Sequence, residues 1–338
     1  MKTYLDKNVY EAALERIAYC FQEFDNVLVA FSGGKDSGVL LNLCYNYADE
    51  HGLLDKLTMY HLDYEAQYQM TTEYVTRTFL EQFPGIRKMW YCVPIKAQSA
   101  CALGEPYWTP WDAAKKKLWV RAMPENPYVV HEGNLDVPFR HGMVDYEFQD
   151  KLSRHFAKKR GTTAVMVGLR ADESLNRYAA VARGKKRRSY EGRKWITQTS
   201  AVTANVYPLY DWRVSDIWTA TARFGFDYNR LYDLLYQAGL TAGQMRVASP
   251  FNDCAQESLK LYKVIDPSNW ARMIGRVNGV NFTGLYGGTT AMGWKTIKLP
   301  PGHTWKSYYE FLLSTMDART AAHYNNILEK SKRYWMQG

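Results

Sequence analysis

Two hydrophobic patterns follow each other near the start of the chain. Residues 8–24 place apolar side chains at helical spacing, and Asp25 and Asn26 end that pattern. Residues 27–31 form a continuous apolar run with the length of a buried parallel strand. Residues 37–49 then return to helical spacing. This order predicts a helix, a buried strand, a short turn and a second helix.

The same alternation continues further along the chain. Apolar runs at 57–62, 88–93 and 164–169 predict three more strands, and residues 71–83 predict a helix between the first two of them. Beyond residue 215 the pattern is mainly helical. Strands that alternate with helices build an α/β fold with a doubly wound parallel sheet, in which ligands collect at the carboxyl ends of the strands.

The stretch before the last of these strands is irregular. Residues 104–150 are rich in Pro, Trp and Tyr, which predicts an insertion with one helix near residues 111–120. We expect an α/β domain over residues 1–218 and a mainly helical C-terminal region over residues 219–338. Within that region, the glycines and aromatics of residues 279–294 are typical of a shaped, packed loop.

Length and charge narrow the class of protein. The chain has 338 residues, of which 46% are hydrophobic, so it can bury a large core. Residues 1–10 lack the apolar run of a signal peptide, and no stretch reaches about eighteen uninterrupted apolar residues, so we expect a cytoplasmic protein without a membrane segment. The net charge is +9, and residues 151–200 carry 14 Lys or Arg against three acidic side chains. This local charge favours a polyanionic ligand: nucleotide phosphates, sulfate or nucleic acid.

The five cysteines show no metal-binding or redox pattern. None forms a C-x-x-C pair or a cysteine–histidine cluster with the spacing of a zinc or iron–sulfur site. We therefore expect neither a structural metal nor a disulfide framework. Cys254, the last of the five, is expected to be a structural residue that packs as a small hydrophobe.

A candidate phosphate site lies between the first predicted strand and the helix after it: Ser32, Gly33, Gly34, Lys35, Asp36 and Ser37. Adjacent glycines let the backbone turn tightly and direct several N–H groups to one point, and the following helix adds its positive end. The serine hydroxyls can donate to phosphate oxygens, Lys35 can neutralise them, and Asp36 can hold a Mg²⁺ ion that bridges phosphates. The spacing differs from the G-x-x-x-x-G-K-[ST] loop of kinases and GTPases. A glycine turn without a ligand is the alternative.

A second polar run follows the strand predicted at 164–169, so it should face the same crevice. It consists of Gly168, Leu169, Arg170, Ala171, Asp172, Glu173 and Ser174, and Arg177 follows. Two separate motifs therefore converge on one edge of the sheet. In the alternative interpretation, Arg170 and Arg177 pair with the neighbouring acidic residues as a surface cluster.

A basic loop is predicted at residues 183–194, where Lys and Arg surround Ser189 and Tyr190. It can clamp a second phosphate group, hold a nucleic-acid backbone, or form a solvated surface loop, and these three interpretations stay open. Nonspecific DNA binding through it would weaken steeply with added salt.

In its strand–turn–helix setting, the turn at 32–37 resembles the PP-loop of the ATP pyrophosphatase and phosphoadenosine phosphosulfate (PAPS) reductase superfamily. The run at 168–174 resembles the second characteristic segment of the PAPS reductase family, and residues 207–218 resemble the segment that closes its sheet with packed aromatics. The resemblance implies an adenine nucleotide α-hydrolase-like fold. It also implies that Arg170 and Arg177 are phosphate or sulfate ligands. Asp63 would then contact the nucleoside, or cap the next helix.

The whole chain also resembles an enlarged PAPS reductase-like subfamily that includes the immunoglobulin-binding regulator A proteins, which implies a ParB-like protein partner. True PAPS reductases need a cysteine in a mobile C-terminal tail, whereas no cysteine follows Cys254 here. They also tend to have a degenerate phosphate turn, whereas Lys35 and Asp36 are present. These departures favour ATP with Mg²⁺ over PAPS.

The leading hypothesis is an adenylyltransferase that cleaves ATP between the α and β phosphates, transfers AMP to an acceptor and releases pyrophosphate. The candidate catalytic residues are Lys35, Asp36, Arg170 and Arg177. The candidate nucleotide-binding residues are Ser32, Gly33, Gly34, Lys35, Asp36, Ser37, Asp63, Gly168, Glu173 and Ser174. One alternative is a nucleotide-sensing protein of transcription regulation that binds ATP or PAPS without turnover and acts with a ParB-like partner or DNA. A further alternative is a sulfonucleotide reductase that uses a partner's thiol.

Overall fold

The computed structural model describes residues 6–102, 104–182, 189–247, 249–256, 258–292 and 298–336. They form two compact units, Met1–Gly288 and Thr289–Gly338. The second unit holds η5 (Thr290–Met292), α11 (Trp305–Ser314) and α12 (Ala318–Met336), and the last two pack against each other. The candidate site lies in the first unit. The domain boundary predicted between residues 218 and 219 stays a prediction.

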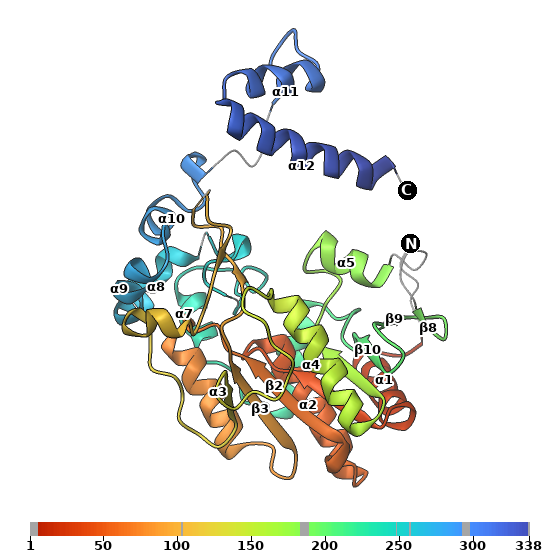
Figure 1. Cartoon of the computed structure of the whole chain (residues 1–338). Helices are drawn as coiled ribbons and strands as arrows, with labels where there is room; N and C mark the ends of the chain where they lie inside the picture. The colour runs from red at the N-terminus through yellow and green to blue at the C-terminus, as the bar shows by residue number, and fades with distance from the viewer. Residues whose placement is uncertain are drawn as a thin grey trace. The chain divides into compact units, whose positions relative to one another are not determined.

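A mostly parallel sheet is the centre of the first unit (Figure 1). Its strands, in spatial order, are β6 (Val129–His131), β3 (Arg87–Cys92), β2 (Leu57–Leu62), β1 (Asn26–Ala30), β7 (Thr163–Val167), β10 (Thr203–Val206), β9 (Arg193–Gln198) and β8 (Ser189–Tyr190). Every neighbouring pair from β6 to β10 is parallel, whereas β9 and β8 extend the sheet in antiparallel fashion. The predicted α/β fold with a largely parallel sheet is therefore confirmed.

Helices cover both faces of this sheet. One face packs against α1 (Val9–Glu23), α2 (Lys35–Glu50), α3 (Gln69–Glu81) and α6 (Val214–Phe224), and the other against α4 (Asp145–Arg160). Side chains alternate along a strand, so Val27 and Val29 enter the first core and Leu28 enters the second. The burial of both faces explains why the strands are continuous apolar runs rather than alternating ones.

The direction in which the chain crosses the sheet changes next to β1. From β1 the chain moves to β2 and then β3 on one side, whereas β7 and β10 lie on the other side. The segment after β1 and the segment after β7 therefore leave the sheet at the same edge, on either side of a topological switch point, where open α/β sheets bind ligands. These two segments carry the two motifs found in the sequence.

The irregular stretch before β7 differs from the prediction. Instead of an α-helix near residues 111–120, the structure has a 3₁₀ helix, η2 (Ala113–Leu118), in which Lys115 has non-helical backbone angles. A short ladder of β4 (Ala97–Gln98) and β5 (Tyr107–Trp108) precedes it, and the unpredicted helix α4 follows. The remaining short elements around the sheet are η1 (Leu54–Lys56) and α5 (Leu175–Ala182).

The first unit ends in a helical region with its own core. It contains α7 (Leu231–Gln237), η3 (Asp253–Ala255), η4 (Leu259–Leu261), α8 (Tyr262–Ile265), α9 (Pro267–Arg276) and α10 (Val280–Tyr286). The prediction of a loop at residues 279–294 is thus wrong for residues 280–286, which form α10. Gly284 allows this helix to pack, because a Cβ there would lie 2.2 Å from Cη2 of Trp270. The mainly helical C-terminal region is confirmed, since the described residues beyond β10 form no further strand.

A buried ion pair attaches this helical region to the sheet domain. The Glu65 carboxylate accepts from Arg276 Nε at 2.8 Å, from the Trp111 N–H at 2.7 Å and from the Val120 N–H at 3.0 Å. Neither Glu65 nor Arg276 is more than 7% exposed. One carboxylate therefore joins the loop after β2, the insertion and α9.

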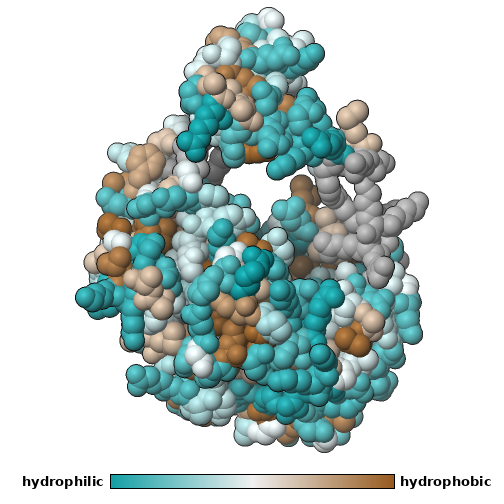
Figure 2. Space-filling view, viewed as in Figure 1, coloured by the Kyte–Doolittle hydropathy of each residue, from teal (hydrophilic) through white to brown (hydrophobic). Residues whose placement is uncertain are grey.

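Within the described ranges, no helix is both long and apolar enough to span a bilayer. On the face of the molecule shown in Figure 2, hydrophilic residues predominate, with hydrophobic ones scattered between them. The cytoplasmic location stays a prediction.

Candidate nucleotide site

The turn after β1 needs glycine for both conformation and space. Gly33 has φ +77°, in the left-handed region that side chains with a Cβ rarely adopt. A Cβ at this position would also lie 2.9 Å from Cγ2 of Val75 on α3. Gly34 is the N-cap of α2, and its N–H donates to Ser32 Oγ at 3.3 Å, so the start of this helix lies at the turn.

Groups of the protein itself occupy part of the turn. The Lys35 N–H donates to the hydroxyl oxygen of Tyr232 at 3.0 Å, and the Ser32 N–H donates to Ser37 Oγ at 3.1 Å. The Ser37 hydroxyl in turn donates to the Gly34 carbonyl at 3.1 Å. A phosphate that enters the turn would have to exchange with these partners or bind beside them.

Two buried cations share one carboxylate at the start of α2. Lys35 is 6% exposed and Arg170 is 3% exposed. The Asp36 carboxylate accepts from Arg170 Nε, and its other oxygen lies 3.4 Å from Lys35 Nζ. Lys35 Nζ also donates to the Met245 carbonyl at 3.0 Å, and Arg170 donates to Asp172 at 2.5 Å. Positive charge is thus concentrated at the helix end where anions bind best.

Burial makes this arrangement sensitive to an added anion. It lowers the pKa of Lys35, and the neighbouring Arg170 lowers it further, while Asp36 only partly offsets the two. Burial also acts against the charged form of Arg170, but Asp36 and Asp172 outweigh it and raise the pKa of the guanidinium. A phosphate beside Lys35 would stabilise its charged form.

The residue directly after β7, Gly168, lies against the main chain of the first turn of α2. A Cβ at Gly168 would lie 2.9 Å from the Ser37 nitrogen and 3.0 Å from the Asp36 carbonyl carbon. Both are main-chain atoms, which cannot rotate away. Glycine at this position therefore allows the two motifs to approach each other.

The rest of the second motif forms a charged cluster. Glu173 lies between two arginines, with Arg177 NH1 at 3.0 Å and Arg246 NH1 at 3.6 Å from its carboxylate oxygens. The Ser174 hydroxyl accepts from the Arg177 N–H at 3.2 Å, at the start of α5. Arginines therefore pair with acidic residues, as in the alternative drawn from the sequence, but Arg170 is buried beside the turn and not on the surface.

Asp63 is separate from these groups. Its carboxylate is fully buried and accepts from Arg121 at 2.5 and 2.6 Å and from Trp90 Nε1 at 2.7 Å. The capping interpretation is wrong, because α3 begins with Tyr68 as its N-cap and the Gln69 N–H donates to Asp266. A nucleoside contact of Asp63 stays a prediction, and its carboxylate would first have to leave Arg121.

The described side chains do not form a metal site by themselves. They include no group of three His, Cys, Asp or Glu residues arranged to bind an ion. Asp36 is the one carboxylate at the turn among them, and Lys35 and Arg170 engage its oxygens. This donor set fits Mg²⁺ only if the ion arrives with nucleotide phosphates that supply most of its ligands.

The predicted basic loop is partly a hairpin. Residues 183–188 lie outside the described residues, whereas 189–190 and 193–198 form β8 and β9, so the loop prediction is wrong there. The Tyr190 hydroxyl donates to Glu23 at 2.6 Å, and the Arg193 guanidinium lies 4.0 Å from the centre of the Tyr19 ring. Tyr190 and Arg193 therefore both contact side chains of α1.

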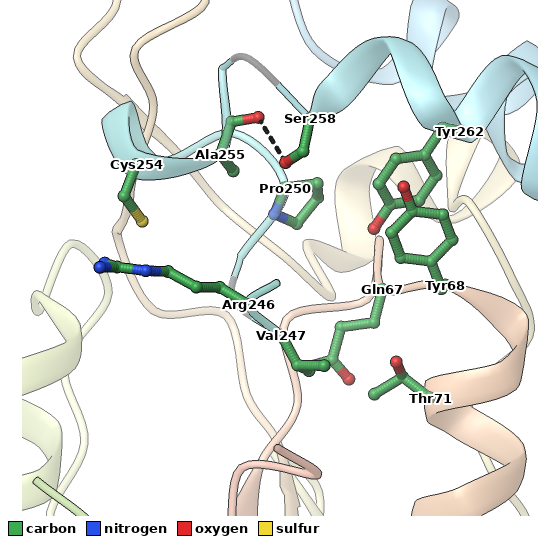
Figure 3. A pocket seen from close by; sticks show the side chains of 10 residues that line it. All are labelled: Gln67, Tyr68, Thr71, Arg246, Val247, Pro250, Cys254, Ala255, Ser258 and Tyr262. Atoms are coloured by element: carbon green, nitrogen blue, oxygen red, sulfur yellow. Dashed lines mark hydrogen bonds between the residues drawn. The ribbon is translucent and has the colours of Figure 1, made fainter. Parts of the chain in front are cut away.

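A small pocket (Figure 3) lies beside the turn, because two of its lining residues, Thr71 and Val247, lie against the Cβ positions of Gly33 and Gly34. One wall comes from the start of α3, with Gln67, Tyr68 and Thr71, and the other from the chain that follows α7, with Arg246 and Cys254. Cys254 is exposed, whereas the other four cysteines are buried. The expectation that Cys254 is a structural, packed residue is therefore wrong.

Several residues at this site gave no signal in the sequence. Tyr232 is part of the apolar pattern of α7, yet its hydroxyl reaches the turn. Met245 contributes only its main-chain carbonyl, which any residue could supply. Arg246 is a single arginine in a segment without a recognisable motif.

The comparison with known protein families identifies the fold. A model described as "Phosphoadenosine phosphosulfate reductase domain" matches residues 26–238. The chain belongs to this PAPS reductase domain family. A second model, described as "Domain of unknown function (DUF3440)", matches residues 239–338. The predicted PAPS reductase-like, PP-loop relationship is thus confirmed, whereas the finer assignment to the immunoglobulin-binding regulator A subfamily stays a prediction.

Relatives of this PAPS reductase family member include one curated protein and several solved structures. Over 327 residues, this chain is 35% identical to "Uncharacterized protein YbdN" of Escherichia coli (strain K12). The alignment covers 95% of this chain and 79% of that protein. The PAPS reductase of Candida auris, solved as a phosphate complex, matches with 13% identity and a TM-score of 0.37, over 69% of this chain and 93% of that one. FMN adenylyltransferase of Candida glabrata, solved with ATP, matches with 14% identity and a TM-score of 0.37, over 69% of this chain and 62% of that one. We transfer no function from the two structures at these TM-scores.

Proposed function

We propose that the chain binds ATP with its phosphates at the turn 32–37, cleaves it between the α and β phosphates, and transfers AMP to an acceptor. The observation that carries the proposal is the pair of buried cations, Lys35 and Arg170, that share the Asp36 carboxylate at the N-terminus of α2, with Asp172 as a second partner of Arg170. Buried charge of this kind is costly unless a partner compensates it. A polyphosphate would supply further negative charge beside Lys35, whose carboxylate partner Asp36 is shared with Arg170.

Each residue then has a definite task. The amides around Gly34 and the hydroxyls of Ser32 and Ser37 would hold the phosphates, and Lys35 would neutralise the leaving pyrophosphate. Arg170 would turn from Asp36 to the α-phosphate, where negative charge builds up during transfer. Mg²⁺ carried by the nucleotide would neutralise further phosphate charge, with Asp36 as its protein ligand.

The family allows a second reaction, reduction of a sulfonucleotide, and one observation favours it. Cys254 is exposed and lines the pocket beside the turn. However, loss of solvation and the nearby Asp253 raise the pKa of this thiol, and Arg246 and Arg177 only partly offset them. A thiol with a raised pKa is largely protonated at neutral pH, so it is a poor nucleophile.

The regulatory alternative also remains testable. A nucleotide sensor would bind ATP or PAPS without turnover and act through a ParB-like partner or through nucleic acid held by residues 183–194. The partner, the nucleic acid and the role in transcription stay predictions.

Product analysis distinguishes the three functions. The purified chain is incubated with ATP, Mg²⁺ and sulfate, and pyrophosphate and adenylated product are measured; a parallel sample receives PAPS and a reduced dithiol. We expect pyrophosphate release that Lys35→Met abolishes and that Lys158→Met, at an exposed site on α4, leaves unchanged. Tight ATP binding without AMP transfer to any acceptor would support a sensor. Sulfite released from PAPS, and lost in Cys254→Ser, would support a reductase.

A further inference from the structure

The two glycines that allow the turn after β1 also leave one of its peptide groups without a fixed orientation. The carbonyl of Gly33 and the N–H of Gly34 belong to the same planar peptide group, so they point in opposite directions. A flip of this group changes only torsions of the two glycines, and glycine adopts positive and negative φ almost equally well. The local sequence therefore does not determine whether the carbonyl oxygen or the N–H faces a ligand.

A side chain from a distant part of the sequence holds this peptide group in one orientation. Asn229, just before α7, donates from Nδ2 to the Gly33 carbonyl at 3.2 Å. On the other side of the peptide group, the Gly34 N–H donates to Ser32 Oγ at 3.3 Å. The carbonyl oxygen is thus held by the helical region, and the N–H stays on the side of the serine hydroxyl.

Asn229 is itself fixed by its surroundings. The residue is 1% exposed, and the same Nδ2 donates to Thr71 Oγ1 on α3 at 2.9 Å. Its Oδ1 accepts from the Leu231 N–H at 3.0 Å. Because a main-chain donor binds the amide oxygen, the amide nitrogen is the atom that must face Gly33.

The neighbouring carbonyls of the turn also have donors of their own. The Phe31 carbonyl accepts from Nδ1 of His61, a residue that is 1% exposed, at 2.8 Å. The Gly34 carbonyl accepts from the Ser37 hydroxyl at 3.1 Å and from the Gly38 N–H at 2.9 Å. The oxygens that would repel an anion are therefore already bound within the protein.

The N–H groups of the turn are bound in a different way. Those of Ser32, Gly34 and Lys35 donate to the hydroxyl oxygens of Ser37, Ser32 and Tyr232, in that order. A hydroxyl is a neutral acceptor, and hydrogen bonds to a charged phosphate oxygen are stronger. An anion can take over such N–H groups, provided that no carbonyl oxygen points at it.

We propose that Asn229 is a positioning residue of the phosphate turn: it holds the Gly33 carbonyl away from the anion, so that N–H groups alone face the phosphates. This inference rests on the phosphate binding in the proposed function and not on the reaction that follows it. Asn229 acts through the Gly33 peptide group and does not contact the ligand. It lies 196 positions from Gly33, which is why no local motif predicts it.

Replacing Asn229 by aspartate separates the donated hydrogen bond from the shape of the side chain. Aspartate keeps an oxygen for the Leu231 N–H, and its protonated form can still donate to the Gly33 carbonyl. Burial raises the pKa of a carboxyl group, so the variant changes from this donor to an ionised acceptor as the pH rises. Isothermal titration calorimetry measures the binding of ATP with Mg²⁺ to the full chain over the pH range in which the wild type stays folded. Each affinity is expressed relative to the wild type at the same pH.

We expect Asn229→Asp to approach wild-type affinity at low pH and to bind about tenfold more weakly at high pH, as the loss of one hydrogen bond allows. Asn229→Leu has a similar size and no donor, so its affinity should be lowered by a similar factor at every pH. This neutral variant distinguishes the lost hydrogen bond from repulsion between a carboxylate and the phosphates.

Asn26 at the start of β1 offers a matched control, because the turn follows the other end of that strand. It is 6% exposed and donates from Nδ2 to the Arg160 carbonyl at 2.8 Å. Asn26→Asp therefore loses the same kind of bond, and we expect it to keep wild-type affinity at each pH.

Wild-type affinity in Asn229→Leu, or a loss in Asn229→Asp that low pH does not restore, would overturn the positioning role while ATP binding by the wild type still supports the proposed function. If circular dichroism shows that Asn229→Leu does not fold, the pH series of Asn229→Asp decides alone. A wild-type chain that binds no ATP at any pH would overturn the proposed function, and this inference with it.

Discussion

Replacing Gly168 by alanine tests the contact between the two motifs. The added Cβ would meet the Ser37 nitrogen at 2.9 Å and the Asp36 carbonyl carbon and oxygen at 3.0 and 3.1 Å, all of them main-chain atoms. Ordinary contact begins near 3.4 Å, so β7 and the first turn of α2 must separate by several tenths of an ångström. Overpacking of this kind costs about 1–3 kcal/mol of the free energy of unfolding.

The same displacement moves the amides that are meant to hold phosphate. Because binding groups need placement within about 0.5 Å, we expect the affinity for ATP with Mg²⁺ to fall roughly tenfold. Urea unfolding followed by tryptophan fluorescence measures the stability, and isothermal titration calorimetry measures the affinity.

A matched glycine controls for the added methyl group. Gly275 lies within α9, where a Cβ would meet no heavy atom within 4 Å. Alanine there should stabilise the protein by about 0.5–1 kcal/mol through helix propensity and leave ATP affinity unchanged. If Gly168→Ala has wild-type stability and affinity, then the approach of β7 to α2 does not shape the site and the reasoning fails.

Three further predictions concern buried charges. Glu65→Gln should lower the free energy of unfolding by about 3–5 kcal/mol, because it leaves Arg276 buried without a charged partner; an unchanged urea midpoint would contradict this. The lowered pKa of Lys35 should rise when phosphate binds, so ATP affinity should fall as pH rises through that pKa; calorimetry in two buffers of different ionisation enthalpy should show proton uptake that Lys35→Met removes. Burial alone would raise the pKa of Asp63, but Arg121 holds it below its ordinary value. The ionised carboxylate therefore stabilises the fold above about pH 4. This contribution is lost as the pH falls through the lowered pKa. Asp63→Asn should therefore flatten the acid limb of the stability curve, and an acid limb as steep as in the wild type would speak against this pairing.

Much of the sheet could be predicted because burial on both faces leaves a clear pattern. The apolar runs at 57–62 and 88–93 correspond to β2 and β3 within one residue. Helix α4 also has a periodic signal, with Phe148, Leu152 and Phe156 one turn apart and buried, but it begins inside a stretch treated as an irregular insertion. The high Pro, Trp and Tyr content of residues 104–150 obscured the helical spacing of these apolar side chains.

Only the parts of the site that consist of consecutive residues could be predicted from the sequence. Two glycines after a buried strand are enough to predict a tight backbone turn. Tyr232 is 197 positions away from Lys35, and Arg121 is 58 positions away from Asp63, so only the folded chain shows these pairings. Neither residue has a neighbour in sequence that predicts its partner.

The carbonyl of Met245 caps Lys35, and this one bond limits how the molecule can be divided. The PAPS reductase domain match ends at residue 238, which suggests a natural cut there. A fragment cut at that point would keep every glycine and serine of the turn, yet it would lack both Arg246 and the carbonyl that accepts from Lys35. Even a truncated protein that folds would therefore give a misleading negative result in any ligand screen.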